Sequence, residues 1–567
     1  MNRSATFTRK IAYIAAIVPL LLLITAISRP ATVTPGRAEN DAGGILAQLR
    51  AEHNLAQAEL GEIDPASETM KLSTLGLRGV AANILWWWAN EYKKREDWDK
   101  LEATVNQIIR LQPNFVEVWD FQAHNLSYNV SVEFDDYRMR YQWVKKGIDF
   151  LILGSHYNRG EPGILSQVGW FVGQKIGRAD EHQQFRRLFR DDKDFHQTFR
   201  DNGVEVDPDG QGPDGKPDNW LVGKLWYNKA VDAHISMEKP IRGRTPLLFY
   251  SGGPMSQMNA AAAMNKDGYF FENAVLAWQR AKDEWQRYGA VELPTSAGFE
   301  ITLNAKEKVD ADIKEWREEL ARLCPGVEEE IRKEKIARLS PDKRAVLDVP
   351  PENRSPEQYS LAYEADMETK VLPRDFLGRS AKLEDRPRVR ELVDLIEQGE
   401  LTTHQIELNR RIVNFAYWRT RAESELTEEA PKAHSSVYEA DKLAASGENL
   451  AKARGLFEGA WELYAKIFEK HPELMENAEA QDLIESIAHY RDVLGQLDEQ
   501  FPQSFPLWPL MDKHQKGQQI RDQVKLLQGN DPSEAKPKEE NKSQTPQSKT
   551  EPPKEEGGKA GDEKAKS

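Results

Sequence analysis

The chain contains a single cysteine, Cys324, in 567 residues. One thiol excludes an internal disulfide, a CxxC redox pair and a zinc site built from several cysteines. Cys324 follows a helical pattern and has no histidine near it in the sequence, so we interpret it as a structural or incidental residue rather than a nucleophile. The near-absence of cysteine also fits an exported protein.

The chain also lacks the basic balance that a nucleic-acid partner requires, because its formal net charge is −15. The most basic stretch, RRLFRDDKDF, alternates in sign and is typical of a solvated helix face. Catalytic patterns are missing too. The histidines, including His124, His182 and His196, form no HxxxH or HExxH pair, and YSGGPMSQ (residues 250–257) lacks the spacing of a phosphate loop or a nucleophile elbow. No enzymatic activity is inferred.

Only one long apolar run is present, at residues 11–27, and it follows Arg3, Arg9 and Lys10. As a helix it would span roughly 25 Å, near the lower limit for crossing a bilayer. We therefore expect a signal-anchor over residues 1–28, although cleavage after Ser28 is an alternative. The positive flank predicts a single-pass protein of the inner (cytoplasmic) membrane, with the bulk of the chain on the periplasmic side.

What the sequence does contain is a helical repeat. Residues 85–113 carry the tetratricopeptide spacing of a large residue, an apolar-small pair, an aromatic residue and a second helix that ends in proline. A second unit begins 34 residues later, at Trp119, and weaker units follow. The matching positions are Leu85, Trp88, Ala89, Tyr92, Pro113, Ala123, Leu165, Gly169, Ala274, Trp278, Ala281, Ala460, Tyr464, Ile467 and Pro472.

The predicted fold is an all-α, tetratricopeptide-like array of helical hairpins with large insertions. We divide it into a signal-anchor (1–28), a linker (29–60), a helical domain (61–300) with an insertion at 180–260, a charged helical hairpin and connection (301–400), a C-terminal helical repeat domain (401–528) and a disordered, charged, Pro-rich tail (529–567).

Within residues 305–345, Val309, Ile313, Trp316, Leu320 and Leu323 form an apolar seam interrupted by Pro325-Gly326. This seam predicts an antiparallel hairpin that projects from the array and folds back within residues 305–345. Just before it, the alternation of Phe299, Ile301 and Leu303 indicates a short strand.

The sharpest candidate for a metal site is DPDGQGPDGKPDNW. It resembles a twelve-residue calcium loop with oxygen ligands from Asp207, Asp209, Gln211 and Asp218. Gln211 is neutral and Asp218 is shorter than the usual glutamate, and a turn-rich connection would have the same composition. Calcium is therefore a possible cofactor beside the simpler reading of a turn.

The stretch from LRGVAANILWWWANEYKK through VGWFVGQKIGRADEHQQFRRLFR resembles an uncharacterised family of planctomycetal membrane-anchored proteins, some of which are labelled "iron responsive element". The resemblance covers most of residues 60–430 and implies a single-pass envelope protein without a known reaction. No residue of this chain supports iron or RNA binding.

We therefore expect a membrane-anchored scaffold that binds a protein or peptide partner and no nucleic acid. The repeat pattern places a groove on the concave face of the array. The groove residues are Asn83, Trp86, Asn90 and Lys93 in the first unit and Glu117, Asp120, His124 and Ser127 in the second. The alternatives are a calcium-binding or enzymatic envelope protein using the 200–260 insertion, and a structural tether acting through the tail.

The triplet Trp86-Trp87-Trp88 cannot share one helix face, since successive residues turn by about 100°. The repeat pattern places Trp88 in the core and Trp86 in the groove, and it leaves Trp87 in need of a covering neighbour such as the segment before residue 75.

Overall fold

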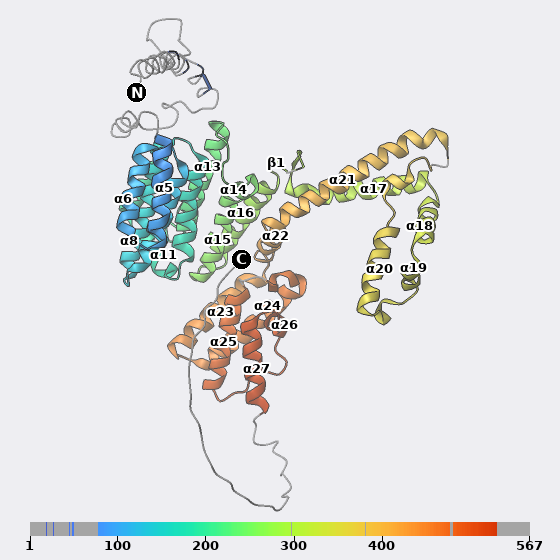
Figure 1. Cartoon of the computed structure of the whole chain (residues 1–567). Helices are drawn as coiled ribbons and strands as arrows, with labels where there is room; N and C mark the ends of the chain where they lie inside the picture. Colours follow the sequence, from blue (N-terminus) through green and yellow to red (C-terminus); the bar gives the residue numbers. More distant parts are fainter. Residues whose placement is uncertain are drawn as a thin grey trace, which may run out of the picture.

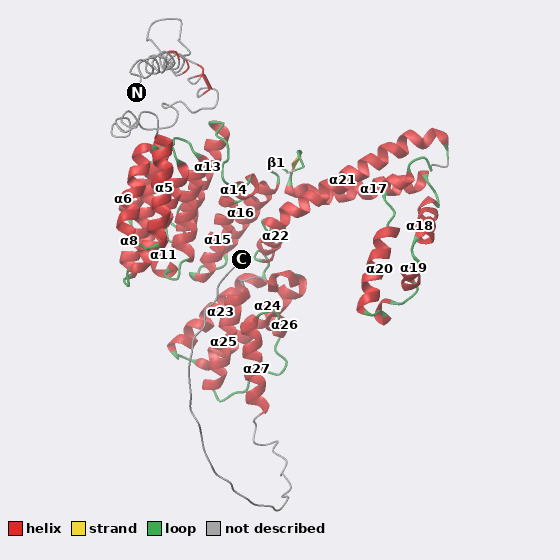
Figure 2. Cartoon of the chain, in the orientation of Figure 1, coloured by secondary structure: helices red, strands yellow, loops and turns green. Residues whose placement is uncertain are grey.

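The computed structural model describes residues 78–529, apart from residues 296, 380–381 and 477–479, together with the isolated residues 19, 27, 45, 48 and 49. Helices carry nearly all the regular structure of this part of the chain (Figure 2). Its only strands are β1 (Leu293–Pro294) and β2 (Glu300–Ile301), which pair antiparallel. The predicted all-α class is confirmed.

The predicted membrane anchor, the linker and all but the first residue of the predicted tail lie outside the continuous described region. Among the described residues, no helix is long and apolar enough to cross a membrane. The apolar run at 11–27 falls outside that search, except for residues 19 and 27.

Two helical hairpins open the array. The first joins α5 (Arg78–Lys94) to α6 (Trp98–Leu111), and the second joins α7 (Val116–His124), with its extensions η1 (Asn125–Val130) and η2 (Ser131–Glu133), to α8 (Tyr137–Tyr157). Trp119 fixes the link between them, because its indole nitrogen donates to the Pro113 carbonyl at 2.8 Å. A Cβ at Gly154 would lie 2.8 Å from the Trp119 ring, so α8 approaches α7 as closely as the small residues allow.

The next helices continue the same core. They are α9 (Pro162–Trp170), η3 (Phe171–Lys175), α10 (Ile176–Arg178), α11 (His182–Asp191), α12 (Lys193–Asp201) and α13 (Asn219–Ser236). Phe185, Phe199 and Trp226 are buried in one cluster with Trp119, so this segment shares the core of the first hairpins. The division that makes residues 180–260 an insertion stays a prediction. Helix α13 packs on α9 at Gly169, where an added Cβ would lie 2.8 Å from the Gly223 carbonyl oxygen.

A middle layer carries the chain from this bundle to the rest of the molecule. It consists of α14 (Pro246–Tyr250), α15 (Gly252–Lys266), α16 (Glu272–Gly289) and α22 (Phe415–Ser424), with α15 packed between α13 and α16 (Figure 1). Trp278 and Trp285 are buried at its centre, and Trp285 donates to the Phe415 carbonyl at 3.1 Å.

A long arm projects from this layer (Figure 1). Helix α17 (Lys306–Leu323) runs antiparallel to α21 (Arg386–Ile412), and α18 (Val327–Arg338), α19 (Pro341–Leu347) and α20 (Pro356–Thr369) hang from the far end. The predicted seam is present, since Ile313, Trp316 and Leu320 pack against Leu392 and Ile396. The predicted partner is wrong: α17 pairs with α21 and not with residues 327–345.

The C-terminal bundle lies below the middle layer in Figure 1. It contains α23 (Glu429–Ser446), α24 (Leu450–Lys470), α25 (Ala480–Gln496), α26 (Trp508–Asp512) and α27 (Gln515–Gly529). Its core holds stacked Phe457 and Trp461 beside Tyr490. Helix α24 ends just before Pro472, as the repeat spacing predicts.

Candidate functional site

A cavity of about 490 Å³ opens between α5, α7 and α9, and we call it the groove cavity. Its volume lies in the range of ligand-binding clefts. The lining side chains come from four segments: α5, α7, α9 with η3, and the loop before α14. They are Trp86, Lys93, Glu117, Asp120, Phe121, His124, Gln167, Trp170, Phe171 and Arg244.

Helical spacing brings the α7 side chains to this face. Glu117, Asp120 or Phe121, and His124 follow one another at steps of three or four, so they project from one side of the helix. The opposite side of α7 is occupied by Val118, Trp119 and Ala123, which are buried. The apolar anchoring of α7 in the core therefore fixes the direction of its cavity face.

Aromatic rings form one wall of the groove cavity. The Trp86 ring contacts Phe121 edge-on at a centroid distance of 4.9 Å and Phe115 at 5.5 Å. Lys93 extends its ammonium nitrogen over Phe121, 4.9 Å from the ring centroid. On the other side, Trp170 contacts Phe171 edge-on at 5.2 Å. Such walls suit an apolar or cationic side chain of a ligand.

A chain of hydrogen bonds fixes the polar wall. The Gln167 amide donates to Asp120 Oδ1 at 2.5 Å, and Arg244 donates to the Gln167 carbonyl oxygen. Burial raises the pKa of Asp120, although Arg244 and the Gln167 hydrogen bond oppose that shift. Burial, helped by Lys93, lowers the pKa of His124. The cavity thus holds a partly desolvated carboxylate beside a largely neutral imidazole at pH 7.

Most of the predicted groove residues meet in this cavity. Its lining includes Trp86, Lys93, Glu117, Asp120 and His124. Three of the predicted groove residues do not line the cavity. Asn83 is exposed outside the cavity, and Ser127 is buried in the core. Asn90 donates its side-chain amide to the Trp86 carbonyl of its own helix at 2.8 Å.

The repeat pattern missed Phe121, Gln167, Trp170, Phe171 and Arg244. Trp170 could have been predicted from the sequence. The register of Leu165 and Gly169 in the third unit places residue 170 at the concave position that Asn90 and His124 hold in the first two units. Arg244 could not have been predicted from the repeat spacing, since it comes from a loop whose path depends on the packing of α13 against α9.

The predicted calcium loop has a different arrangement from the one its spacing suggested. Residues 210–218 close on themselves, with the Gly212 amide donating to the Lys216 carbonyl at 2.8 Å and the Asp218 amide to the Gly210 carbonyl at 2.8 Å. The Asp207 carboxylate accepts from Arg200 at 2.5 Å and from Gln211 at 2.5 Å, while Asp209 is exposed.

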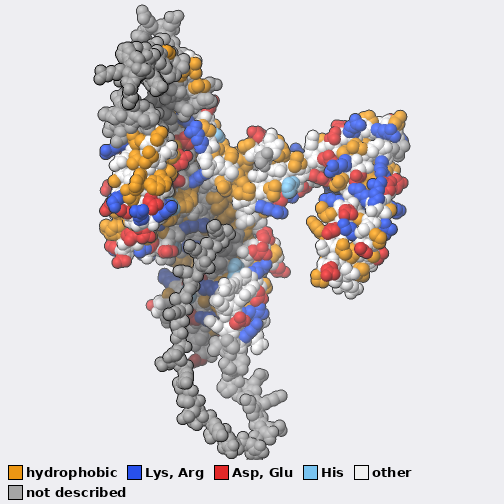
Figure 3. All heavy atoms as spheres, in the orientation of Figure 1, with side chains coloured by type: hydrophobic (Ala, Val, Ile, Leu, Met, Phe, Trp, Pro, Cys, Tyr) orange, Lys and Arg blue, Asp and Glu red, His pale blue; other side chains and the backbone are white. Residues whose placement is uncertain are grey.

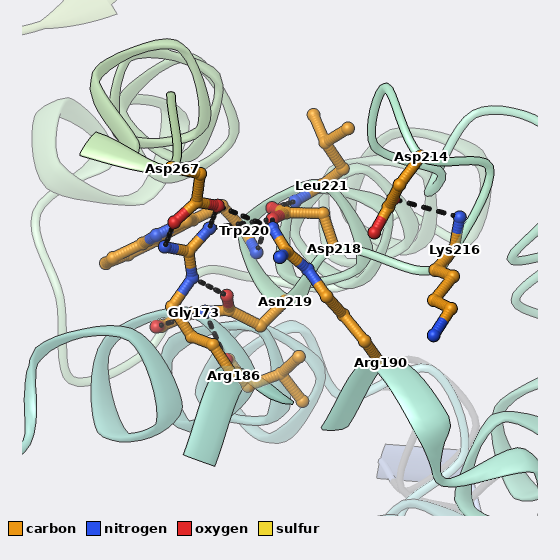
Figure 4. Close-up of polar contacts among 11 residues, drawn as sticks. Gly173, Arg186, Arg190, Asp214, Lys216, Asp218, Asn219, Trp220, Leu221 and Asp267 are labelled. Atoms are coloured by element: carbon orange, nitrogen blue, oxygen red, sulfur yellow. Dashed lines mark hydrogen bonds and ion pairs between the residues drawn. The ribbon is translucent and has the colours of Figure 1, made fainter. Parts of the chain in front are cut away.

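The Asp218 carboxylate forms a helix cap and an ion pair instead of pointing into the loop's centre as a calcium ligand would (Figure 4). It caps α13 by accepting from the Trp220 amide at 2.9 Å, and it forms an ion pair with Arg186 at 3.2 Å. Arg186 also contacts Asp267 at 2.9 Å, and Arg190 contacts Asp267 at 2.6 Å. The structure therefore does not bring Asp207, Asp209, Gln211 and Asp218 together around one point, because arginines and a helix cap engage Asp207 and Asp218. Calcium binding by this loop stays a prediction.

Within the described part of the chain, no three His, Cys, Asp or Glu side chains gather in a way that could hold a metal ion. Cys324 is buried in the core between α17 and α21, and burial raises the pKa of its thiol.

Neither a scan of protein-family models nor a search of curated proteins finds a match to this chain. The resemblance to the planctomycetal membrane-anchored family stays a prediction.

Proposed function

We propose that this chain is a tetratricopeptide-like scaffold that holds a peptide segment of a partner protein in the groove cavity. One observation carries the proposal. Side chains that the repeat spacing assigns to the concave face, namely Trp86, Lys93, Glu117, Asp120 and His124, line a single cavity. A repeat array uses that face to bind partners.

The chemistry of the walls favours a peptide over a small anion. Trp86, Phe121 and Trp170 offer aromatic surface for one anchoring side chain, which is the kind of contact that dominates interface energies. Glu117 and Asp120 add acceptors for peptide N–H groups or for a basic side chain, and Lys93 and Arg244 add donors. With both signs of charge present, the groove cavity fits a polypeptide with mixed polar groups.

We further propose that the array is held at the periplasmic face of the inner membrane by residues 11–27. The uncharged apolar run and its basic flank support this location.

The test compares partner capture by the full chain and by two groove variants in detergent-solubilised membranes. Glu117 is exposed, so Glu117→Lys changes the cavity charge without disturbing the core. Its matched control is Glu102→Lys, an exposed position on α6. We expect partner recovery to fall by about tenfold with Glu117→Lys, a typical loss for a central interface residue, and to be unchanged with Glu102→Lys.

The second groove variant is Trp86→Ala, with Asn83→Ala as its control because Asn83 lies on α5 but outside the cavity. Thermal unfolding of each variant separates lost binding from lost folding. The proposal fails if the same partner is recovered equally by Glu117→Lys, Trp86→Ala and the unmodified chain.

A further inference from the structure

The outer side of α5 carries an apolar stripe without a described neighbour. Val80, Ile84 and Trp87 follow one another at steps of four and three, so they share one face of the helix, and Trp88 lies beside that face, about 100° round the helix from Trp87. Trp87 is 62% exposed and Trp88 is 42% exposed. Figure 3 shows hydrophobic side chains gathered over this end of the array.

The aromatic side chains of the stripe contact one another and form a continuous surface. Trp87 contacts Trp88 edge-on at 5.1 Å, and Trp88 stacks on Tyr92 at 6.0 Å. The first helix of a repeat array normally turns a polar face to solvent or is covered by a capping helix. Since α5 has tryptophans at that position, the structure points to a cover.

A matching surface lies earlier in the same chain. Ile45 and Leu49 are helical, one turn apart, and are 62% and 45% exposed. The sequence continues the same helical spacing with Ala56, Leu60 and Ile63. The two apolar stripes therefore belong to one polypeptide and are separated only by residues 64–77.

The connection is long enough for the two stripes to meet. Residues 64–77 can span at most about 46 Å when extended, whereas α5 is about 25 Å long. A helix that ends at Ile63 can thus reach any point of the α5 face. Covalent linkage also gives this segment an effective concentration on the order of millimolar, which favours it over a second copy of the chain.

We propose that residues 45–63 form a capping helix that packs on Val80, Ile84, Trp87 and Trp88. The cap closes the open end of the array. Because the inner side of α5 carries Trp86 and Lys93, the cap also fixes one wall of the groove cavity. The inference is independent of the proposed partner binding, since it concerns the opposite face of the helix.

A photo-cross-linking experiment tests the contact in the full chain, reconstituted in lipid nanodiscs. Trp87 is replaced by p-benzoylphenylalanine, and a matched control carries the same group at Glu102, on the exposed face of α6. Equal amounts of isotopically light and heavy chain are mixed before irradiation, so that mass spectrometry distinguishes links within one copy from links between two.

We expect links from position 87 to residues 45–63 of the same copy, at several times the yield of the control. Links to the other isotopic copy would show that a dimer covers the face. Links to lipid would show a membrane contact, and yields equal to the control would show an open surface. Each of these three results overturns the proposal.

Hydrogen exchange gives a second measurement. Leu49→Glu with Leu60→Glu places two charges in the predicted cap interface, whereas Asn54→Glu places one on the opposite side of the same helical pattern. We expect the protection of α5 amides to fall by about tenfold in the double variant, equivalent to losing about 1.4 kcal/mol of local stability. The Asn54→Glu chain should keep its protection, and an equal fall in both chains would contradict the cap.

Discussion

Asp149 on α8 is a half-buried acid whose ionisation works against the fold. Its Oδ1 atom has no hydrogen-bond partner among the described residues. Lys145, whose charge acts on Asp149, is already engaged with both oxygens of Asp192 at 3.1 Å. Burial therefore raises the pKa of Asp149 to about 6. The Lys145 charge opposes that shift, and the Asp192 charge adds to it with a smaller effect. The substitution that tests this reasoning is Asp149→Asn.

The expected size follows from the two pKa values. The difference between about 6 in the fold and 3.8 for the free side chain corresponds to about 3 kcal/mol. Since Asp149 is only partly buried, solvent screening reduces this to about 1–2 kcal/mol. A raised acid pKa means that the folded state binds the proton more tightly. The penalty is therefore absent below about pH 4, grows as the pH rises to about 6, and is complete at pH 7.

The assay is urea unfolding read by hydrogen exchange of α8 peptides, which reports the unit that contains Asp149 rather than the whole chain. Asp149→Asn should match the unmodified chain near pH 4 and exceed it by about 1–2 kcal/mol at pH 7. The control is Asp135→Asn, an exposed position in the loop before α8, which should change neither value. A variant that loses stability at pH 7, or keeps the original pH slope, would refute the argument.

Two further substitutions test helix packing and the Asp218 network. Gly169→Ala should cost about 1–3 kcal/mol in thermal unfolding, because its Cβ would lie 2.8 Å from the Gly223 carbonyl oxygen. Gly459→Ala on the exposed face of α24, where a Cβ would meet no atom of the described residues within 4 Å, should stabilise by up to about 1 kcal/mol. Equal effects at both sites would exclude a packing role for Gly169. Asp218→Ala should cost about 2–4 kcal/mol, since it removes a helix cap and a partner of Arg186. The unmodified chain should melt at the same temperature in calcium and in chelator, and a rise with calcium would restore the cation-site hypothesis.

The sequence predicted the helical class and much of the groove for a physical reason. Both depend on local spacing, because residues three or four apart share a helix face in any tertiary context. Asp120 and His124 could therefore be placed on one face of α7 before any neighbouring helix was known. The same reasoning extended to the third unit would have added Trp170.

Features that depend on distant segments could not be predicted in this way. The seam of Ile313, Trp316 and Leu320 is a correct local pattern, but it does not specify which helix fills it. The partner, α21, begins more than sixty residues after α17 ends. Likewise, the calcium spacing around Asp218 says nothing of Arg186, which approaches from α11 and takes the carboxylate.

Trp88 shows how a repeat pattern can fail at the end of an array. In an inner unit its position would contact the preceding hairpin, but α5 is the first helix of the continuous described region, and its buried face is centred on Ala82, Trp86 and Ala89. Packing against α6 and α7 thus sets the rotation of α5, and that rotation turns Trp88 outward. A side chain that the repeat assigns to the core becomes part of an exposed surface. The pattern therefore marks Trp88 as a residue to be covered, and the structure limits that cover to something that approaches from the N-terminal side of the array.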